Sequence, residues 1–271
     1  MHCLGFSLKH TLDSGQFFRY HEQDEWYYIV TRDKVFYVKQ TQDELLFEGA
    51  SARFVRHFFG LDEDYARITR ELSQDPVLAR AIRTYAGLRL IRQDPWECTI
   101  GFLCSQLSNI KKIKHNMECI ATLFGTPVVF KGKTFHTFPP PGAITDAVKL
   151  KACAVGFRAK YILAVNDTVS DKWFAKLRTL PYERARERLM ELPGIGEKVA
   201  DCILLFSLGF TEAFPVDVWM ERVLTEQYFP HKKKQPKDLV AFGKNKWGAH
   251  AGYAQQYLYH WARMHKSTHT F

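Results

Sequence analysis

The stretch Leu192-Pro193-Gly194-Ile195-Gly196-Glu197-Lys198-Val199-Ala200-Asp201-Cys202, followed by Phe214-Pro215-Val216-Asp217-Val218-Trp219, decides the fold. It predicts a tight turn between two helices, a helix-hairpin-helix near residues 182–209. Gly194 and Gly196 permit a positive φ and let a ligand come close to bare backbone. The amides of the turn begin a new helix, so the positive end of a helix dipole faces outward and favours a phosphate.

Lys198 lies in the first turn of the second helix. The positive helix end disfavours its ammonium, and any burial would lower its pKa further. Only a neutral amine attacks carbon, so this position suits a nucleophilic lysine. Asp217 follows Pro215 and is well placed to cap the next helix. Alone, Lys198 would be interpreted as a solvent-facing charge and Asp217 as a structural cap, but the combined motif is far more specific.

The first 50 residues predict an antiparallel sheet. Two stretches, Glu25–Thr31 and Lys34–Lys39, are rich in aromatic and β-branched residues, and the short Arg32-Asp33 link between them fits a hairpin. Glu44–Glu48 ends at Gly49 and makes a third strand.

From Ser51 onward apolar residues recur at three- and four-residue steps, which is typical of helices. Asp94 precedes Pro95 as an N-cap, and the helix that it begins continues to Leu107. The segment Phe138–Gly142 is a loop by composition. Further helices are expected over Ala143–Val155, Arg158–Asp167, Tyr182–Leu192, Lys198–Leu208, Val218–Tyr228 and Tyr253–His265.

These elements predict an α+β fold. An N-terminal antiparallel sheet domain with a trailing helix, residues 1–85, is expected to pack on a larger all-α domain, residues 86–271. The active site should lie in a cleft between helical subdomains, with Gly15 reaching in from the N-terminal part.

The balance of charge favours a polyanionic partner. Lys and Arg number 38 against 29 Asp and Glu, for a formal net charge of +9. Neutralising phosphates releases counterions and supplies most non-specific affinity for nucleic acid, although a basic surface alone does not establish it. The run His231–Lys237 is basic; most such runs are solvated loops, and this one is also a candidate phosphate contact.

The six cysteines contain no C-x-x-C pair and predict free, mostly buried thiols. We see no secretory signal and no run near the ~20 apolar residues of a membrane helix. An intracellular monomer without a membrane is expected, in the nucleoid-bearing cytoplasm of a prokaryote or the nucleus of a eukaryote.

The hairpin motif resembles that of the helix-hairpin-helix, Gly/Pro-rich, Asp superfamily of DNA glycosylases. Within it the chain is similar to the 8-oxoguanine DNA glycosylases, a resemblance that also rests on Ser14–Tyr20, Leu90–Glu97 and Ala251–Tyr259. It implies an enzyme of base excision repair that flips an oxidised purine out of double-stranded DNA. Lys198 would excise the base through a Schiff base and cleave 3′ to the abasic site by β-elimination. Asp217 would stabilise positive charge developing on the sugar.

The resemblance also assigns the base pocket. The Gly15 carbonyl would accept a hydrogen bond from N7–H, a proton that 8-oxoguanine has and guanine lacks. Gln255 would read the Watson–Crick edge, and Tyr259 would lie against one face of the base. Cys202 would lie against the other face. Core packing is a serious rival for Cys202 and Tyr259.

Other residues would contact the DNA. Phe157 and Arg158 match an aromatic wedge and an arginine at the orphaned opposite base; a surface arginine beside a core phenylalanine is the alternative. Gly194, Gly196 and Asn109 are further candidates. The resemblance implies no organic cofactor and no metal-binding residues. Carbonyls of the hairpin turn could hold a monovalent cation against a phosphate.

Three departures from the family pattern stand out. Leu107 and Lys112 replace residues that help to read the opposite cytosine, so weaker discrimination against other opposite bases is expected. Trp219 replaces a histidine that commonly supports a DNA phosphate.

Rival hypotheses stay open at this point. A glycosylase-lyase for oxidised pyrimidines shares the superfamily, but many members carry a four-cysteine cluster after the motif, and no cysteine follows Cys202 here. An alkylpurine glycosylase usually lacks the lysine. A non-catalytic DNA-binding protein would need only the hairpin, which leaves Lys198, Asp217 and the base-reading set unexplained.

Overall fold

The computed structural model describes residues 1–230, 232 and 234–265. The strands are β1 (Tyr20–Gln23), β2 (Trp26–Thr31), β3 (Lys34–Thr41), β4 (Glu44–Glu48), β5 (Pro127–Phe130) and β6 (Lys133–His136). The helices are α1 (Leu8–Asp13), α2 (Ala52–Phe58), α3 (Tyr65–Leu72), α4 (Pro76–Thr84), α5 (Pro95–Ser105), α6 (Ile110–Phe124), α7 (Ala147–Ala152), α8 (Ala159–Thr168), α9 (Asp171–Leu177), α10 (Tyr182–Met190), α11 (Glu197–Ile203), α12 (Val218–Tyr228), α13 (Pro236–Trp247) and α14 (Ala251–His265). Short helical turns are η1 (Gly156–Arg158), the π-helical η2 (Leu204–Leu208) and η3 (Gly248–His250).

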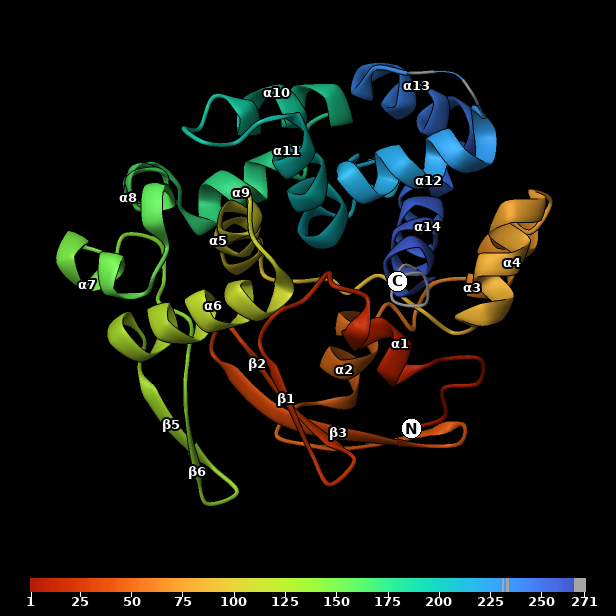
Figure 1. Cartoon of the computed structure of the whole chain (residues 1–271). Helices are drawn as coiled ribbons and strands as arrows, with labels where there is room; N and C mark the ends of the chain where they lie inside the picture. Colours follow the sequence, from red (N-terminus) through yellow and green to blue (C-terminus); the bar gives the residue numbers. More distant parts are fainter. Residues whose placement is uncertain (231, 233, 266–271) are drawn as a thin grey trace, which may run out of the picture.

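The first four strands form an antiparallel sheet in the order β1-β2-β3-β4, a meander that lies beneath helices α1 and α2 (Figure 1). The predicted hairpin is confirmed, because Thr31 pairs with Lys34 across the Arg32-Asp33 turn. Strand β1 was not predicted, since its Tyr-His-Glu-Gln sequence has none of the apolar alternation of a half-buried strand.

Aromatic side chains join the sheet to the helix above it. Phe36 of β3 and Phe58 of α2 are buried with ring centroids 5.7 Å apart in an edge-to-face arrangement. The Ser51 hydroxyl accepts a hydrogen bond from the Phe54 amide and so begins α2. This small core extends to Ile91, which lies in the segment that leads into the helical region.

Helix α5 is the centre of the larger, helical core. Asp94 caps it by accepting a hydrogen bond from the Glu97 amide at 3.0 Å, and Pro95 occupies the first helical position, as predicted. Its residues from Trp96 to Cys104 are all buried. Helix α11 packs directly against it, and α14 packs against α4 and α12. The α+β class is therefore confirmed.

The predicted helices over Arg158–Asp167, Tyr182–Leu192, Val218–Tyr228 and Tyr253–His265 are confirmed with small changes in their ends. The helix predicted over Ala143–Val155 is shorter, limited to α7, and the one predicted over Lys198–Leu208 ends in the π-helical η2. Helices α1, α6, α9 and α13 and the β5–β6 hairpin were not predicted. Side-chain packing places α3 and α4 in the larger core, with Ile68 and Leu78 among its buried residues. The domain boundary at residue 85 stays a prediction.

Two further observations complete the fold. The six cysteines are free; Cys119 is half-buried and the other five are buried. None of the helices in the described part of the chain has both the length and the apolar character needed to cross a membrane.

Buried charges tie the sheet to the helical core. Arg19, 1% exposed, extends from the strand region, and its Nε lies 3.2 Å from a carboxylate oxygen of Glu118. Its Nη1 lies 3.5 Å from Glu97 of α5. A Glu97 oxygen also accepts a hydrogen bond from the Arg32 amide at 2.6 Å. Burial is the largest influence on Glu97 and raises its pKa to about 7, despite the opposing effect of Arg19.

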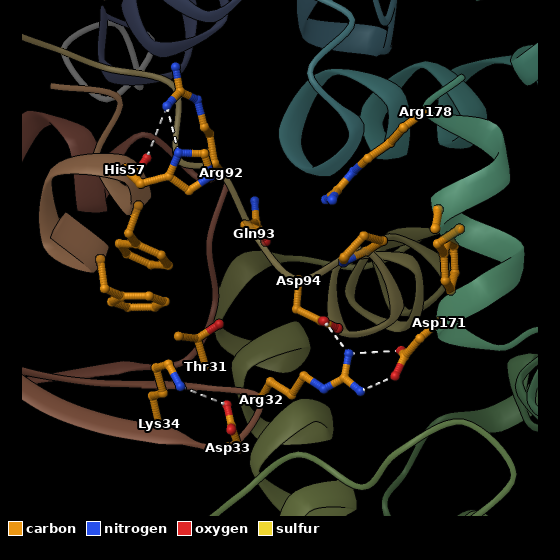
Figure 2. Close-up of a pocket in the computed structure, with 15 residues that line it drawn as sticks. Thr31, Arg32, Asp33, Lys34, His57, Arg92, Gln93, Asp94, Asp171 and Arg178 are labelled. Carbon is orange, nitrogen blue, oxygen red and sulfur yellow. Dashed lines mark hydrogen bonds and ion pairs between the residues drawn. The ribbon is translucent and has the colours of Figure 1, made fainter. Parts of the chain in front are cut away.

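The Arg32 side chain makes a second junction at the edge of a hollow of about 590 Å³ (Figure 2). Its Nη1 donates to Asp94 and to Asp171 of α9, both at 2.8 Å. Figure 2 shows Arg32 between the carboxylates of Asp94 and Asp171, beside the β2–β3 turn, and Arg178 across the hollow from Arg32.

We expect Arg19→Met to destabilise the protein by about 3–5 kcal/mol, because Glu97 would stay buried without its charged partner. The loss should be larger at pH 8 than at pH 5. Glu97 titrates in the folded state at about pH 7, above its ordinary value of 4.5, so it is mostly neutral at pH 5 and charged at pH 8. Urea unfolding at both pH values measures this. An equal loss at the two pH values would contradict the account.

Candidate active site

The helix-hairpin-helix is built from α10, a turn at residues 191–196 and α11, which continues into η2. Asp201 of α11 joins the two helices, since one of its oxygens accepts hydrogen bonds from Tyr182 at 2.7 Å and from Arg186 Nε at 2.8 Å. This buried network fixes the angle at which the turn projects.

The two glycines of the turn play different geometric roles. Gly194 has φ +81°, and a Cβ there would overlap the ring of Tyr161 on α8. Gly196 has φ −93°, and a Cβ there would meet nothing within 4 Å. The expected positive φ is therefore confirmed for Gly194 and wrong for Gly196. Gly196 instead leaves an open approach to the backbone that begins α11.

Lys198 is the second residue of α11 and is partly buried. Its Nζ lies 3.5 Å from the Ser105 hydroxyl and 5.2 Å from the centre of the Phe102 ring on α5. Burial is the largest influence and lowers its pKa, but interactions with Cys202, Asp217 and Tyr259 outweigh it, and the pKa of Lys198 is raised. The expectation of a lowered pKa is wrong for the DNA-free protein, because these polar neighbours surround the amine.

Asp217 is the N-cap of α12, as the sequence predicted. One oxygen, Oδ1, accepts hydrogen bonds from the amides of Trp219 and Met220, each at 3.0 Å. These bonds hold the carboxylate in place, and Asp217 lines the same cavity as Lys198. A residue 19 positions after Lys198 in sequence is thus brought to its side.

That cavity lies between the N-terminal segment, α11 and α14. Its walls include Gly15, Lys198, Cys202, Asp217, Gln255 and Tyr259, the six catalytic and base-pocket residues expected from the sequence; Phe102, Phe206, Pro215 and Gln256 complete it. Its volume of about 30 Å³ has room for no more than a few water molecules. A purine can enter only after the walls move apart.

Gln255 faces the cavity with an unmet hydrogen-bonding group. The side chain is 5% exposed, and its Oε1 is buried without a hydrogen-bond partner in the described structure. A buried amide oxygen left unpaired costs stability, so it is positioned for a donor that is supplied from outside. The structure therefore places a vacant acceptor in the candidate base pocket.

Gly15 is held at the rim by its two neighbours. The Ser14 carbonyl accepts a hydrogen bond from Gln256 of α14 at 3.0 Å. Buried Gln16 donates to the Arg89 carbonyl at 2.8 Å and accepts from the Ile91 amide at 2.7 Å. The N-terminal segment is thereby fixed to both the helical core and the pocket wall.

The expected stacking pair also flanks the cavity. Cys202 is 3% exposed, and burial raises the pKa of its thiol to about 12, so it is neutral at physiological pH. Tyr259 is half-buried on α14, one helical turn after Gln255. Burial raises the pKa of Tyr259 as well, which keeps its hydroxyl neutral.

The DNA-facing candidates are arranged differently from the sequence-based alternative. Phe157 is 49% exposed and Arg158 only 3% exposed, so the phenylalanine lies outside and the arginine inside. Arg158 donates to the carbonyls of Val155, Gln106 and Leu107. Its guanidinium therefore holds the loop before α6 in the DNA-free protein.

Leu107 at the tip of that loop is 92% exposed and has φ +46°, an uncommon backbone conformation for leucine. The neighbouring Gln106 donates to the Gly194 carbonyl at 3.1 Å, which ties the loop to the hairpin turn. Asn109 caps α6 by accepting a hydrogen bond from the Lys112 amide at 2.9 Å. Within the basic run, His231 and Lys233 lie outside the described residues.

Sequence reasoning missed four parts of this site. Ser105 and Phe102 contact Lys198 from α5, and Phe206 stacks on Phe102 with ring centroids 5.5 Å apart. Pro215 forms another wall. The apolar helical spacing of Phe102 and Phe206 looks the same as ordinary core packing, and nothing local in the sequence connects Ser105 or Pro215 with Lys198, so the three-dimensional structure is needed to find them.

The hollow at the β2–β3 turn contains none of the candidate catalytic residues. In the 590 Å³ hollow of Figure 2, Arg92 pairs with Asp62 and Glu63, and Arg178 donates to the Ser207 carbonyl. Among the described residues, no group of three or more His, Cys, Asp and Glu side chains is arranged to hold a metal ion.

The two glycines give a matched test of the turn. Gly194→Ala should lower the free energy of unfolding by about 2–4 kcal/mol, because it combines a strained φ with a clash against Tyr161. Gly196→Ala should leave unfolding nearly unchanged but weaken binding to duplex DNA roughly tenfold, because the added methyl group would obstruct the approach of a phosphate to the amides that begin α11 and weaken about one charge-assisted hydrogen bond. Thermal unfolding and fluorescence anisotropy measure the two effects. Equal destabilisation by both substitutions would contradict the assignment.

Comparison with known proteins agrees with this geometry. A family profile described as the 8-oxoguanine DNA glycosylase N-terminal domain matches residues 3–99. A probable N-glycosylase/DNA lyase of Methanothermobacter thermautotrophicus is 34% identical over 213 residues, which are 70% of this chain and 68% of the relative. An Arabidopsis thaliana N-glycosylase/DNA lyase is 32% identical, over 74% of this chain and 60% of that protein. The match thus spans less than two thirds of the plant relative.

Solved structures agree as well. The Clostridium acetobutylicum 8-oxoguanine glycosylase/lyase, bound to double-stranded DNA with cytosine opposite 8-oxoguanine, superposes with a TM-score of 0.91 at 31% identity. The match covers 96% of this chain and 93% of that one. A structure described as MBOgg1 with a low-affinity DNA ligand gives a TM-score of 0.92 at 36% identity, with the same coverage of both chains. The chain belongs to the 8-oxoguanine DNA glycosylase family.

Proposed function

We propose that the protein is a bifunctional DNA glycosylase and abasic-site lyase that removes 8-oxoguanine from duplex DNA in base excision repair. The observation that carries the proposal is the cavity in which Lys198 and Asp217 meet the unpaired Gln255 oxygen. Relatives named N-glycosylase/DNA lyase, and the Clostridium enzyme bound to DNA with 8-oxoguanine, support the reaction and the lesion.

The pocket groups complement a flipped purine. Gly15 presents a carbonyl that can accept from N7–H, and Gln255 presents an amide that can pair with the Watson–Crick edge. Cys202 and Tyr259, both neutral, offer apolar contact to the two faces. An undamaged guanine lacks the N7 proton and would leave the Gly15 carbonyl unpaired, which disfavours it.

The chemistry then falls to Lys198. As a neutral amine it attacks C1′ of the sugar, the bond from C1′ to the base breaks, and the base departs with a proton. Opening of the C1′–O4′ bond, with O4′ taking up a proton, then converts the aminal to a Schiff base. The Schiff base makes a C2′ proton acidic; loss of this proton breaks the C3′–O bond and releases the 3′ phosphate. Asp217, held by the α12 amides, supplies the anion that stabilises positive charge at the sugar.

The raised pKa of Lys198 adds one requirement. The amine is protonated in the free protein, so it must lose a proton before attack. Entry of a base into the closed cavity would separate Lys198 from the groups that now raise its pKa. We therefore expect the chemical step to accelerate as pH rises toward the pKa of Lys198 in the DNA complex.

Single-turnover kinetics on a duplex with 8-oxoguanine opposite cytosine test the proposal. Lys198→Gln should lose at least about a thousandfold in base release and strand cleavage, because the nucleophile is gone. Asp217→Asn keeps the shape and should lose about 10²–10³. Arg53→Met, an exposed substitution on α2, is the control and should leave the rates unchanged.

Other outcomes would redirect the proposal. Activity in both variants equal to that of the wild type would favour a non-catalytic hairpin protein. A wild type that releases oxidised pyrimidines but not 8-oxoguanine would favour the pyrimidine branch of the superfamily.

Weak discrimination of the opposite base is a second expectation. Leu107 presents an apolar tip, Lys112 is exposed, and Arg158 is engaged with loop carbonyls rather than turned outward. We expect excision opposite cytosine to exceed excision opposite adenine by less than about 100-fold. The double variant Leu107→Asn/Lys112→Arg should increase that ratio. A ratio of 100 or more in the wild type would show the expectation to be wrong.

Three further features stay proposals. We expect the protein to act as a monomer, at the cell's DNA. A monovalent cation could bind carbonyls of the hairpin turn; Gly194, one of them, already accepts a hydrogen bond from Gln106 and has a second lone pair. Weaker DNA binding when potassium is replaced by tetramethylammonium would support the cation.

A further inference from the structure

Arg263 occupies a position at the pocket edge that the proposed mechanism does not use. It lies one helical turn after Tyr259 on α14, and its Cζ is 5.7 Å from the centre of the Tyr259 ring. A Cβ built on Gly15 would lie 2.5 Å from Arg263 Nη1, and 3.1 Å from Ile110 Cδ1. The guanidinium therefore lies directly against the glycine at the rim of the cavity.

The two terminal nitrogens of this guanidinium differ. Nη2 donates to the Asp13 carbonyl, two residues before Gly15, which anchors the side chain. Nη1 is buried and has no hydrogen-bond partner in the described part of the chain. A cationic donor buried without an acceptor is costly, and the Gly15 side of the pocket is where it could find one.

Arg263 forms no ion pair with a carboxylate in the described part of the chain. The His260 ring lies beside it, with Nδ1 3.5 Å from Nη2. Burial is the main cause that lowers the pKa of His260 to about 4, so this ring is neutral at physiological pH. Arg263 thus brings a positive charge to the pocket edge that no described carboxylate neutralises by an ion pair.

Gln255 and Arg263 together define a ligand with complementary groups. The buried Gln255 oxygen requires a donor, and the Arg263 nitrogen at the Gly15 rim requires an acceptor. Resting on the proposed function, a base that offers N7–H to the Gly15 carbonyl carries its additional oxygen on the adjacent ring atom, C8. That oxygen would lie next to Gly15, where Arg263 Nη1 is found.

We propose that Arg263 is a specificity-determining residue that donates a hydrogen bond from Nη1 to the C8 oxygen of the flipped base. In the free protein the same side chain, with Ile110, narrows the empty pocket at Gly15. When the base enters, Arg263 Nη2 keeps its hydrogen bond to the Asp13 carbonyl. Nη1, which has no partner in the free protein, then forms a charge-assisted hydrogen bond with the base. The enzyme would then recognise both marks of the lesion, the N7 proton and the C8 oxygen.

Arg263→Met tests this, since it keeps an unbranched chain and removes the donor. Base release from 8-oxoguanine should slow about 10- to 100-fold in single turnover. Cleavage of a preformed abasic site, which has no base, should change less than about twofold. Arg263→Lys should recover part of the loss, and Arg53→Met, an exposed arginine on α2, should cause none.

A substrate with one atom replaced distinguishes recognition of the C8 oxygen by Arg263 from a purely structural role of that residue. 8-Thioguanine keeps N7–H but carries sulfur, a weak acceptor, on C8. Arg263→Met should cost less than about threefold on this base. An equal loss on both bases, no loss, or faster release in Arg263→Met would overturn the assignment and leave a residue that only closes the pocket. A wild type inactive on 8-oxoguanine would instead overturn the proposed function.

Discussion

The buried amide of Gln16 is the interaction on which the site depends. Its side chain donates to the Arg89 carbonyl and accepts from the Ile91 amide, and its own carbonyl accepts a hydrogen bond from Gln93 at 2.8 Å. This places the N-terminal segment against the residues that lead into α5. Without that placement Gly15 would not reach a pocket whose other walls include Lys198, Asp217 and Gln255, all distant from it in sequence.

The site combines polar groups that have hydrogen-bond partners with polar groups that have none in the free protein. Asp217 and Asp201 have their hydrogen bonds supplied by helix amides or by neighbouring side chains, so their geometry is fixed. The Gln255 oxygen and Arg263 Nη1 are buried without partners. Such groups cost stability in the free protein, and the cost is recovered only when a ligand provides the missing donors and acceptors. The closed, 30 Å³ cavity is consistent with this, because the pocket is complete only around a base.

Much of this could be predicted from sequence where the signal was local. The hairpin turn, the caps at Asp94 and Asp217, and the β2–β3 hairpin follow from side chains that act on their own backbone. The raised pKa of Lys198 and the inward orientation of Arg158 could not, because both depend on neighbours that are distant in sequence. Strand β1 was not predicted for a different reason: it is a polar edge strand without the apolar face that would indicate a strand in the sequence.

The central claim is that Lys198 is the nucleophile in this pocket. Borohydride reduction during reaction with 8-oxoguanine duplex, followed by proteolysis and mass spectrometry, tests it most directly. The account predicts a sugar-phosphate remnant on the peptide that contains Lys198, and on that residue within it. A remnant on another lysine, or release of the base with no covalent adduct, would contradict it.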